Sequence, residues 1–356
     1  MRNPLLRTLA LSTLFSAALA SATDGKTLAA AQGIPYPAVI AHRGASYDAP
    51  ESTTPAYLLA RELGADYLEL DLQRTRDGVL VVVHDDELSR TSNVAERFPE
   101  RAKSPVSAFT LAELKSLDAG SWFNQAYPKR ARSSFEKLPI LTLDEVIDIA
   151  EGNPDRHPGL YIETKVPNQF PGIEKDLKAR LEARGWLDRP GRVVLQTFDR
   201  NSLKLLHEAM PQVPKILLLW VGNNGIASAS GQDFAQSGEQ DKAAFYARQQ
   251  PKDKAEYLRW LDHATQEGAI GTGPSATRTH LGEQSYSDLI QPWMNQANHQ
   301  RGLLVHVYTL DDRVDFDKAM QSGVDGIFTN RSAELLRFLQ RPVKRSEPEL
   351  LQTLGY

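Results

Sequence analysis

Two histidines in this chain stand directly after short apolar runs. His42 follows residues 38–41, and His84 follows residues 79–83. Imidazoles titrate near neutral pH, so two of them in one site can serve as the general acid and the general base that phosphodiester cleavage requires. Taken alone, His42 could equally be satisfied by backbone carbonyls. His84 could likewise be incidental to capping by Asp85 and Asp86.

Three carboxylates show a spacing typical of strands. Glu69 and Asp71 are two residues apart, so both side chains lie on one strand face, and Glu163 has the same relation to Lys165. Neighbouring carboxylates at low dielectric repel, and a bound cation resolves that repulsion. Three oxygen ligands suit a hard cation rather than zinc. The alternatives are a solvent-facing polar strand for the first pair and a buried ion pair for the second.

Two basic residues and one aromatic residue complete the predicted site. Arg43 has a planar fork that suits phosphate oxygens, and Lys165 can reach a non-bridging phosphate oxygen. Tyr308, at a later strand end, is predicted to shape a pocket for a glycerol moiety. We expect His306, two residues earlier, to be structural.

The elements that must position these residues alternate between β-rich and helical patterns, which predicts an α/β fold with a parallel β/α barrel of the TIM type. In such barrels the functional groups gather at the carboxyl ends of the strands, where most of these residues fall. Helical patterns include residues 285–298 and 332–340, the latter with Ser332 as its cap. The expected strands are residues 38–41, 65–71, 79–84, 159–165, 192–197, 215–220, 268–271, 303–309 and 324–329.

Three segments interrupt the alternation. Residues 74–78 form a turn too short for a crossover helix, so that region is not a plain βαβ unit. Residues 86–137 are polar and are expected to form an insertion above the barrel mouth. Residues 222–264 form a second expected insertion, with a helix near its end.

The N-terminal residues 1–22 predict a secretory signal peptide, because Arg2 and Arg7 precede a short apolar run and small residues follow it. We expect a flexible segment at 23–36, the barrel at 37–341 and a tail at 342–356. The chain has no cysteine, which excludes disulfides and thiolate metal sites, and its net charge of -4 does not favour nucleic acid as a partner. A soluble periplasmic or secreted protein without a stable membrane anchor is the prediction.

Together the motifs resemble the glycerophosphodiester phosphodiesterase family in order and spacing, and the long insertions and the leader look like its periplasmic branch. The resemblance covers about residues 38–339. It departs from the family at Ser52, Tyr308 and Asp311, where asparagine, tryptophan and asparagine are usual. The motifs are His42-Arg43-Gly44, Pro50-Glu51-Ser52-Thr53, Glu69-x-Asp71, His84-Asp85, Glu163-x-Lys165, Gln196-Thr197-Phe198, Val307-Tyr308-Thr309 and residues 323–330.

The resemblance implies metal-dependent hydrolysis of small glycerophosphodiesters to sn-glycerol 3-phosphate and an alcohol, through a cyclic phosphate. His42 and His84 would be acid and base, Arg43 and Lys165 would bind phosphate, and the three carboxylates would bind Ca²⁺ or Mg²⁺. A lysophospholipase D or sphingomyelinase-like enzyme on the same barrel is one alternative. It needs apolar surface, and no clustered aromatics are evident in the insertions. A non-catalytic exported solute-binding protein is the other alternative.

Overall fold

Eight parallel strands close into a ring in the computed structural model, which describes residues 24–280 and 285–356. Pairing of the first strand with both its successor and the last strand completes the ring. The expected α/β barrel is therefore confirmed, while the expected signal peptide, residues 1–22, lies outside the described residues. The ring consists of β1 (Ala38–Ala41), β2 (Tyr67–Arg74), β4 (Gly159–Thr164), β5 (Val193–Thr197), β6 (Lys215–Leu219), β7 (Gly271–Pro274), β8 (Leu304–Val307) and β9 (Gly326–Thr329).

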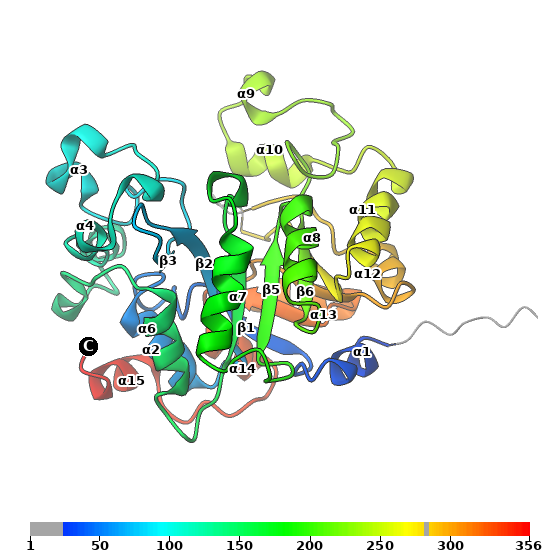
Figure 1. Cartoon of the computed structure of the whole chain (residues 1–356). Coiled ribbons are helices and arrows are strands. Elements are labelled where there is room, and N and C mark those ends of the chain that lie inside the picture. Colours follow the sequence, from blue (N-terminus) through cyan, green and yellow to red (C-terminus); the bar gives the residue numbers. More distant parts are fainter. Residues whose placement is uncertain (1–23, 281–284) are drawn as a thin grey trace, which may run out of the picture.

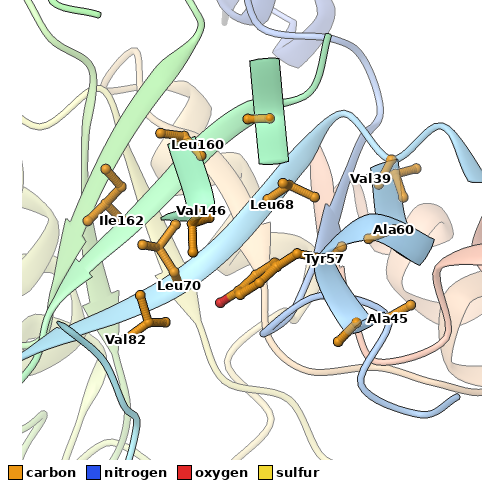
Figure 2. Close-up of a cluster of buried hydrophobic side chains, with 14 of the residues drawn as sticks. Val39, Ala45, Tyr57, Ala60, Leu68, Leu70, Val82, Val146, Leu160 and Ile162 are labelled. Carbon is orange, nitrogen blue, oxygen red and sulfur yellow. The ribbon is translucent and has the colours of Figure 1, made fainter. Parts of the chain in front are cut away.

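Helices surround the ring and connect successive strands (Figure 1). Successive side chains along a strand point alternately outward and inward, so the apolar residues form one layer outside the ring and another inside it. Leu160 and Ile162 of β4 pack outward against helices, together with Leu68 and Leu70 of β2 (Figure 2), whereas Tyr161 fills the barrel interior. The crossover helices are α2 (Thr54–Leu63), α6 (Leu143–Glu151), α7 (Ile173–Ala183), α8 (Arg200–Ala209), α11 (Lys254–Gln266), α12 (Pro292–His299) and α13 (Arg313–Ser322). The helix α14 (Ser332–Phe338) follows the last strand.

A hairpin and the first insertion stand between β2 and α6. β3 (Leu80–Val82) runs antiparallel to β2 outside the ring, as the short turn at residues 74–78 requires. The insertion that follows has its own apolar cluster, which includes Phe109 and Leu114 and continues onto the hairpin. It contains α3 (Val94–Arg97), α4 (Leu111–Lys115) and α5 (Ser121–Ala126), with 3-10 turns at Pro99–Arg101, Val106–Ala108 and Ser133–Phe135.

The second insertion is shorter than expected. Residues 222–253 carry α9 (Phe234–Ser237) and α10 (Lys242–Arg248) above the strand ends, but α11 is the crossover helix between β6 and β7. The prediction that the insertion extends to residue 264 is therefore wrong. From sequence alone, a crossover helix that follows a long loop looks the same as a helix that belongs to the loop.

Several element boundaries also differ from expectation. The segment 23–36, expected to be flexible, contains α1 (Gly25–Ala31), which packs on β8. The expected strand 268–271 is instead Gly271–Pro274, and the expected helix 285–298 begins only at Pro292. Ser332 lies inside α14, whose cap residue is Arg331.

The expected tail, residues 342–356, contains α15 (Glu347–Thr353), which packs on α2. Its Ser346 side chain and Glu349 form a reciprocal capping box, which satisfies donors at the start of the helix. In the described part of the chain, none of the helices has the length and apolar content needed to cross a bilayer.

The outer apolar layer generates a stability prediction. Leu160 is fully buried between β4 and the helices, so Leu160→Ala leaves a cavity and is expected to lower the free energy of unfolding by about 2–5 kcal/mol. Val314 on α13 is 55% exposed, so Val314→Ala is the matched control, with an expected change within about 0.5 kcal/mol. Urea unfolding followed by circular dichroism measures both. Equal losses in the two variants would contradict this assignment of the layer.

Candidate active site

Three carboxylates converge inside the barrel at the carboxyl ends of β2 and β4. The strands pair with Asp71 opposite Glu163, and Glu69 lies one inward position earlier on β2. One carboxylate oxygen from each residue lies within 4.8 Å of the others, and all three side chains are buried. The structure thus brings together the three acids that the sequence singled out.

Burial and the charge of Asp71 make Glu69 and Glu163 hard to ionise. Burial, then the charge of Asp71, raises the pKa of Glu69 well above its ordinary value. Burial also raises the pKa of Glu163 to about 7, although Lys165 partly opposes the shift. The Lys165 ammonium lies 3.0 Å from Glu163 and 3.9 Å from Asp71, so one cation already offsets part of the negative charge.

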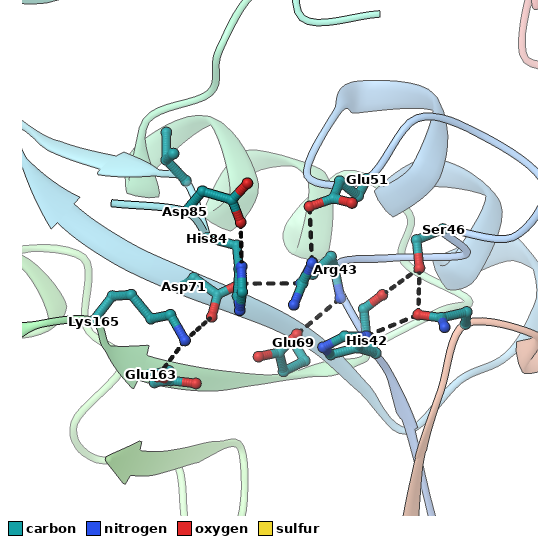
Figure 3. A network of polar contacts seen from close by, with 12 residues as sticks. His42, Arg43, Ser46, Glu51, Glu69, Asp71, His84, Asp85, Glu163 and Lys165 are labelled. Carbon is teal, nitrogen blue, oxygen red and sulfur yellow. Dashed lines mark hydrogen bonds and ion pairs between the residues drawn. The ribbon is translucent and has the colours of Figure 1, made fainter. Parts of the chain in front are cut away.

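Arg43, in a tight turn directly after β1, contacts two of the acids through its backbone and its side chain. Its backbone has φ 56°, a strained conformation, and its N–H donates to Glu69 over 2.8 Å. Its guanidinium lies 2.9 Å from Glu51 and 3.5 Å from Asp71 (Figure 3). Gly44 follows at φ 83°, where a Cβ would come within 2.7 Å of the Ala56 backbone, so the turn needs glycine.

The two histidines lie beside this cluster. His42 Nδ1 lies 2.8 Å from the Asn330 side-chain oxygen, and burial, then Arg43, lowers the pKa of His42 to about 3. His84 Nδ1 lies 2.7 Å from Asp85 Oδ1. Partial burial, then Arg43, lowers the pKa of His84 as well. Both imidazoles are therefore disposed to be neutral before substrate binds.

A cavity of about 2110 Å³ opens above the cluster and contains both histidines, the acids and Lys165 in its lining. Five aromatic side chains form one wall, with successive ring centroids 5.7–6.3 Å apart. Tyr308 belongs to this wall, with its hydroxyl donating to the Leu219 carbonyl over 3.1 Å. Tyr246 also packs against Phe234 and Phe245 within the second insertion, so the expectation that the insertions lack clustered aromatics is wrong. The aromatic wall comprises Phe198, Trp220, Tyr246, Tyr286 and Tyr308.

Comparison with known proteins assigns a family to this arrangement. The model of the glycerophosphoryl diester phosphodiesterase family matches residues 42–334. The chain is 35% identical over 294 residues to a glycerophosphodiester phosphodiesterase of Bacillus subtilis, with 82% of each chain covered. It is 29% identical to a glycerophosphodiester phosphodiesterase of Haemophilus influenzae, covering 94% of this chain and 99% of the relative. The chain belongs to the glycerophosphoryl diester phosphodiesterase family.

Solved structures share the barrel of this family member. A phosphodiesterase of Oleispira antarctica in complex with the product sn-glycerol-3-phosphate aligns with a TM-score of 0.60 at 23% identity, covering 86% of this chain and 97% of that one. A glycerophosphodiester phosphodiesterase of Agrobacterium tumefaciens aligns with a TM-score of 0.54, covering 83% and 97%. The family is one of enzymes, so the interpretation as a solute-binding protein is set aside.

The acidic cluster fits a divalent cation. Its three donors are carboxylate oxygens, which Ca²⁺ and Mg²⁺ prefer, and Asp71 Oδ2 is buried without a hydrogen-bond donor among the described residues. Arg43 and Lys165 supply two positive charges to three buried acids. Glu69, Asp71 and Glu163 are thus suited to hold one cation.

Sequence reasoning missed the residues that support the histidines. Arg90 donates to Asp85 over 3.0 Å and to Glu51 over 2.7 Å, so Glu51 joins the surroundings of His84 to those of Arg43. Asn330 directly follows β9, so inspection of strand ends could have found it. Arg90, in an insertion loop, has no such signal.

The cluster also yields a prediction about stability. Because folding raises the pKa of Glu163 from about 4.5 to about 7, the cation-free protein is expected to lose stability as pH rises through that window. In Glu163→Gln, this part of the pH dependence disappears. Thermal unfolding in chelator from pH 4.5 to 8 measures it. Added Ca²⁺ or Mg²⁺ at pH 8 is expected to raise the melting temperature of the unsubstituted protein.

The matched control is Glu136→Gln, an exposed acid in the first insertion. Glu136→Gln retains both the pH dependence and the cation response. A cation response that survives equally in Glu163→Gln would show that the three acids do not hold the ion.

Proposed function

We propose that this enzyme hydrolyses glycerophosphodiesters to sn-glycerol 3-phosphate and an alcohol, with Ca²⁺ or Mg²⁺ held by Glu69, Asp71 and Glu163. The convergence of two imidazoles and three buried carboxylates in one cavity carries the proposal. The names of the relatives support the substrate class, and the product complex of the Oleispira antarctica phosphodiesterase supports the product.

Positive charge at the base of the cavity binds the phosphodiester. Arg43 and Lys165 lie at the carboxylates, so their N–H groups can also reach non-bridging phosphate oxygens. A bound cation would add Lewis-acid stabilisation of the charge on those oxygens. The Tyr308 ring forms part of the wall against which the glycerol moiety lies.

The two imidazoles divide the proton transfers. One accepts the proton of the glycerol hydroxyl next to the phosphate, and that oxygen bonds to phosphorus. The negative charge of the bound phosphodiester favours protonation of the other imidazole, which gives that proton to the departing oxygen as the bond from phosphorus to the alcohol breaks. Water then opens the cyclic phosphate with the proton transfers reversed. Arg43 and Lys165 stabilise the charge that develops on the phosphoryl oxygens.

The second candidate function is that of a lysophospholipase D or a sphingomyelinase-like enzyme. Its substrate would differ from a glycerophosphodiester by carrying an acyl chain. The aromatic wall favours it, because the rings offer apolar surface. Charged residues of the same cavity, among them Arg90, Lys204 and Lys242, favour a small polar alcohol instead. We therefore retain the deacylated diester as the substrate.

Replacing either histidine is expected to lower turnover sharply. His42→Ala and His84→Ala each remove one proton-transfer group, so kcat for glycerophosphocholine should fall by about 10²–10⁴-fold. Coupled detection of released sn-glycerol 3-phosphate measures this, and chelator should remove activity that Ca²⁺ or Mg²⁺ restores. Parallel assays with a lysophospholipid and with a diester lacking the free hydroxyl define the substrate.

The control is His157→Ala, because His157 is exposed at the amino end of β4, opposite the cavity. It is expected to retain activity, and circular dichroism checks that all three variants fold. Full activity in both active-site variants would refute the roles of the histidines. Faster turnover of the lysophospholipid would favour the second candidate, and equal rates without the free hydroxyl would exclude internal attack.

We further propose that the enzyme is exported to the periplasm or beyond the cell after removal of residues 1–22. The basic, apolar and small-residue order of that segment supports this. Expression of the full chain in a Gram-negative host should yield mature protein that begins near Ser21 to Thr23. N-terminal sequencing of the periplasmic fraction measures this, and an intact N-terminus in the cytoplasmic fraction alone would contradict it.

A further inference from the structure

Asn330 contacts His42 across the closure of the barrel. It is the first residue after β9, and β9 pairs with β1 so that Thr329 lies opposite Ala41. The Asn330 side-chain oxygen lies 2.8 Å from His42 Nδ1. The Ser46 hydroxyl lies 2.8 Å from the same oxygen. Asn330 therefore has polar partners on the side that faces His42.

Asp311 determines which way the Asn330 amide points. Its Oδ1 accepts from the Asn330 backbone N–H over 2.8 Å, and its Oδ2 accepts from Asn330 Nδ2 over 2.9 Å. An ionised carboxylate only accepts, so the amide nitrogen must face Asp311 and the amide oxygen must face His42. Arg278 donates to Asp311 Oδ2 over 2.8 Å, which holds this carboxylate in place.

The orientation of the amide selects one tautomer of His42. Because the amide oxygen can only accept, Nδ1 of the neutral imidazole carries the hydrogen, and Nε2 keeps its lone pair. His84 differs, because its Nδ1 faces the carboxylate of Asp85 rather than an amide. A carboxylate stabilises an imidazolium more strongly than a neutral amide does.

We propose that Asn330 and Asp311 are positioning residues that hold His42 as the Nδ1–H tautomer, with Nε2 as the proton acceptor at the start of turnover. The proposal rests on the proposed function for its kinetic consequences, but not for the tautomer itself. The charged or titratable groups that face His42 are Arg43 beside it, Glu51 before α2, Lys165 after β4 and His84 after β3. The group hydrogen-bonded to Nδ1 is the uncharged amide.

Asp311→Asn tests the orientation of the amide. The substitution replaces one acceptor oxygen with an NH₂ group, which conflicts with the donors of Asn330 and Arg278. The Asn330 amide is then expected to flip, so that its nitrogen faces His42 and selects the Nε2–H tautomer. Nitrogen-15 shifts of His42 in the Ca²⁺- or Mg²⁺-loaded enzyme report the tautomer. The kcat for glycerophosphocholine should fall by about tenfold to hundredfold, with KM within about twofold.

Asn330→Asp tests the charge at Nδ1. It keeps an oxygen toward His42 but makes the partner anionic, which favours the imidazolium. Because a base must be unprotonated to act, the acidic limb of kcat/KM should move to higher pH by about one unit. The control is Asn93→Asp in the first insertion, where the side-chain oxygen accepts from the Asp118 N–H over 2.8 Å. It is the same chemical change outside the cavity lining, and its profile should not move.

Three results would overturn the proposal. One is an Nε2–H tautomer of His42 in the unsubstituted enzyme. The second is an effect of Asp311→Asn on kcat no larger than that of Asn93→Asp, and the third is an unmoved acidic limb in Asn330→Asp. If Asp311→Asn fails to fold, the other two measurements decide. Absence of diester turnover in the unsubstituted enzyme would refute the proposed function, while the nitrogen-15 spectrum would still test the positioning.

Discussion

Repulsion among three buried carboxylates is the constraint on which this structure depends. Register between β2 and β4 places Asp71 opposite Glu163, and the two-residue period of a strand brings Glu69 to the same interior face. In a low dielectric, such acids are stable as anions only when positive charge compensates them. The surrounding structure provides two basic side chains, Arg43 and Lys165, for three carboxylates. One negative charge remains for a bound cation to compensate.

The compensating groups also connect the rest of the site. Arg43 contacts Asp71 and Glu51, and Glu51 contacts Arg90, which in turn holds Asp85 beside His84. The strained turn at Arg43 directs its N–H to Glu69 immediately after His42. A change at any member of this chain of contacts therefore alters the charge that the carboxylates experience, in addition to its local effect.

Sequence alone located the chemistry well and its supports poorly. Strand ends share one edge of a barrel, so the rule that placed His42, Glu69, Asp71 and Glu163 together needed only local patterns. The aromatic wall is drawn from five places between Phe198 and Tyr308, and no local pattern joins them. The strand Gly271–Pro274 was misplaced because its glycines and proline have low strand propensity, and only neighbouring strands hold it extended.

Closure of the ring affects the order in which the contacts of the active site form during folding. The acids and both imidazoles come from the first half of the chain, through Glu163, whereas the partner of His42 is 288 positions further along. β9 must dock between β1 and β8 before Asn330 reaches that imidazole. During biosynthesis, a chain that has folded only its leading strands would contain all of these reactive groups, but the contact between His42 and Asn330 would form only when the last strand closes the ring.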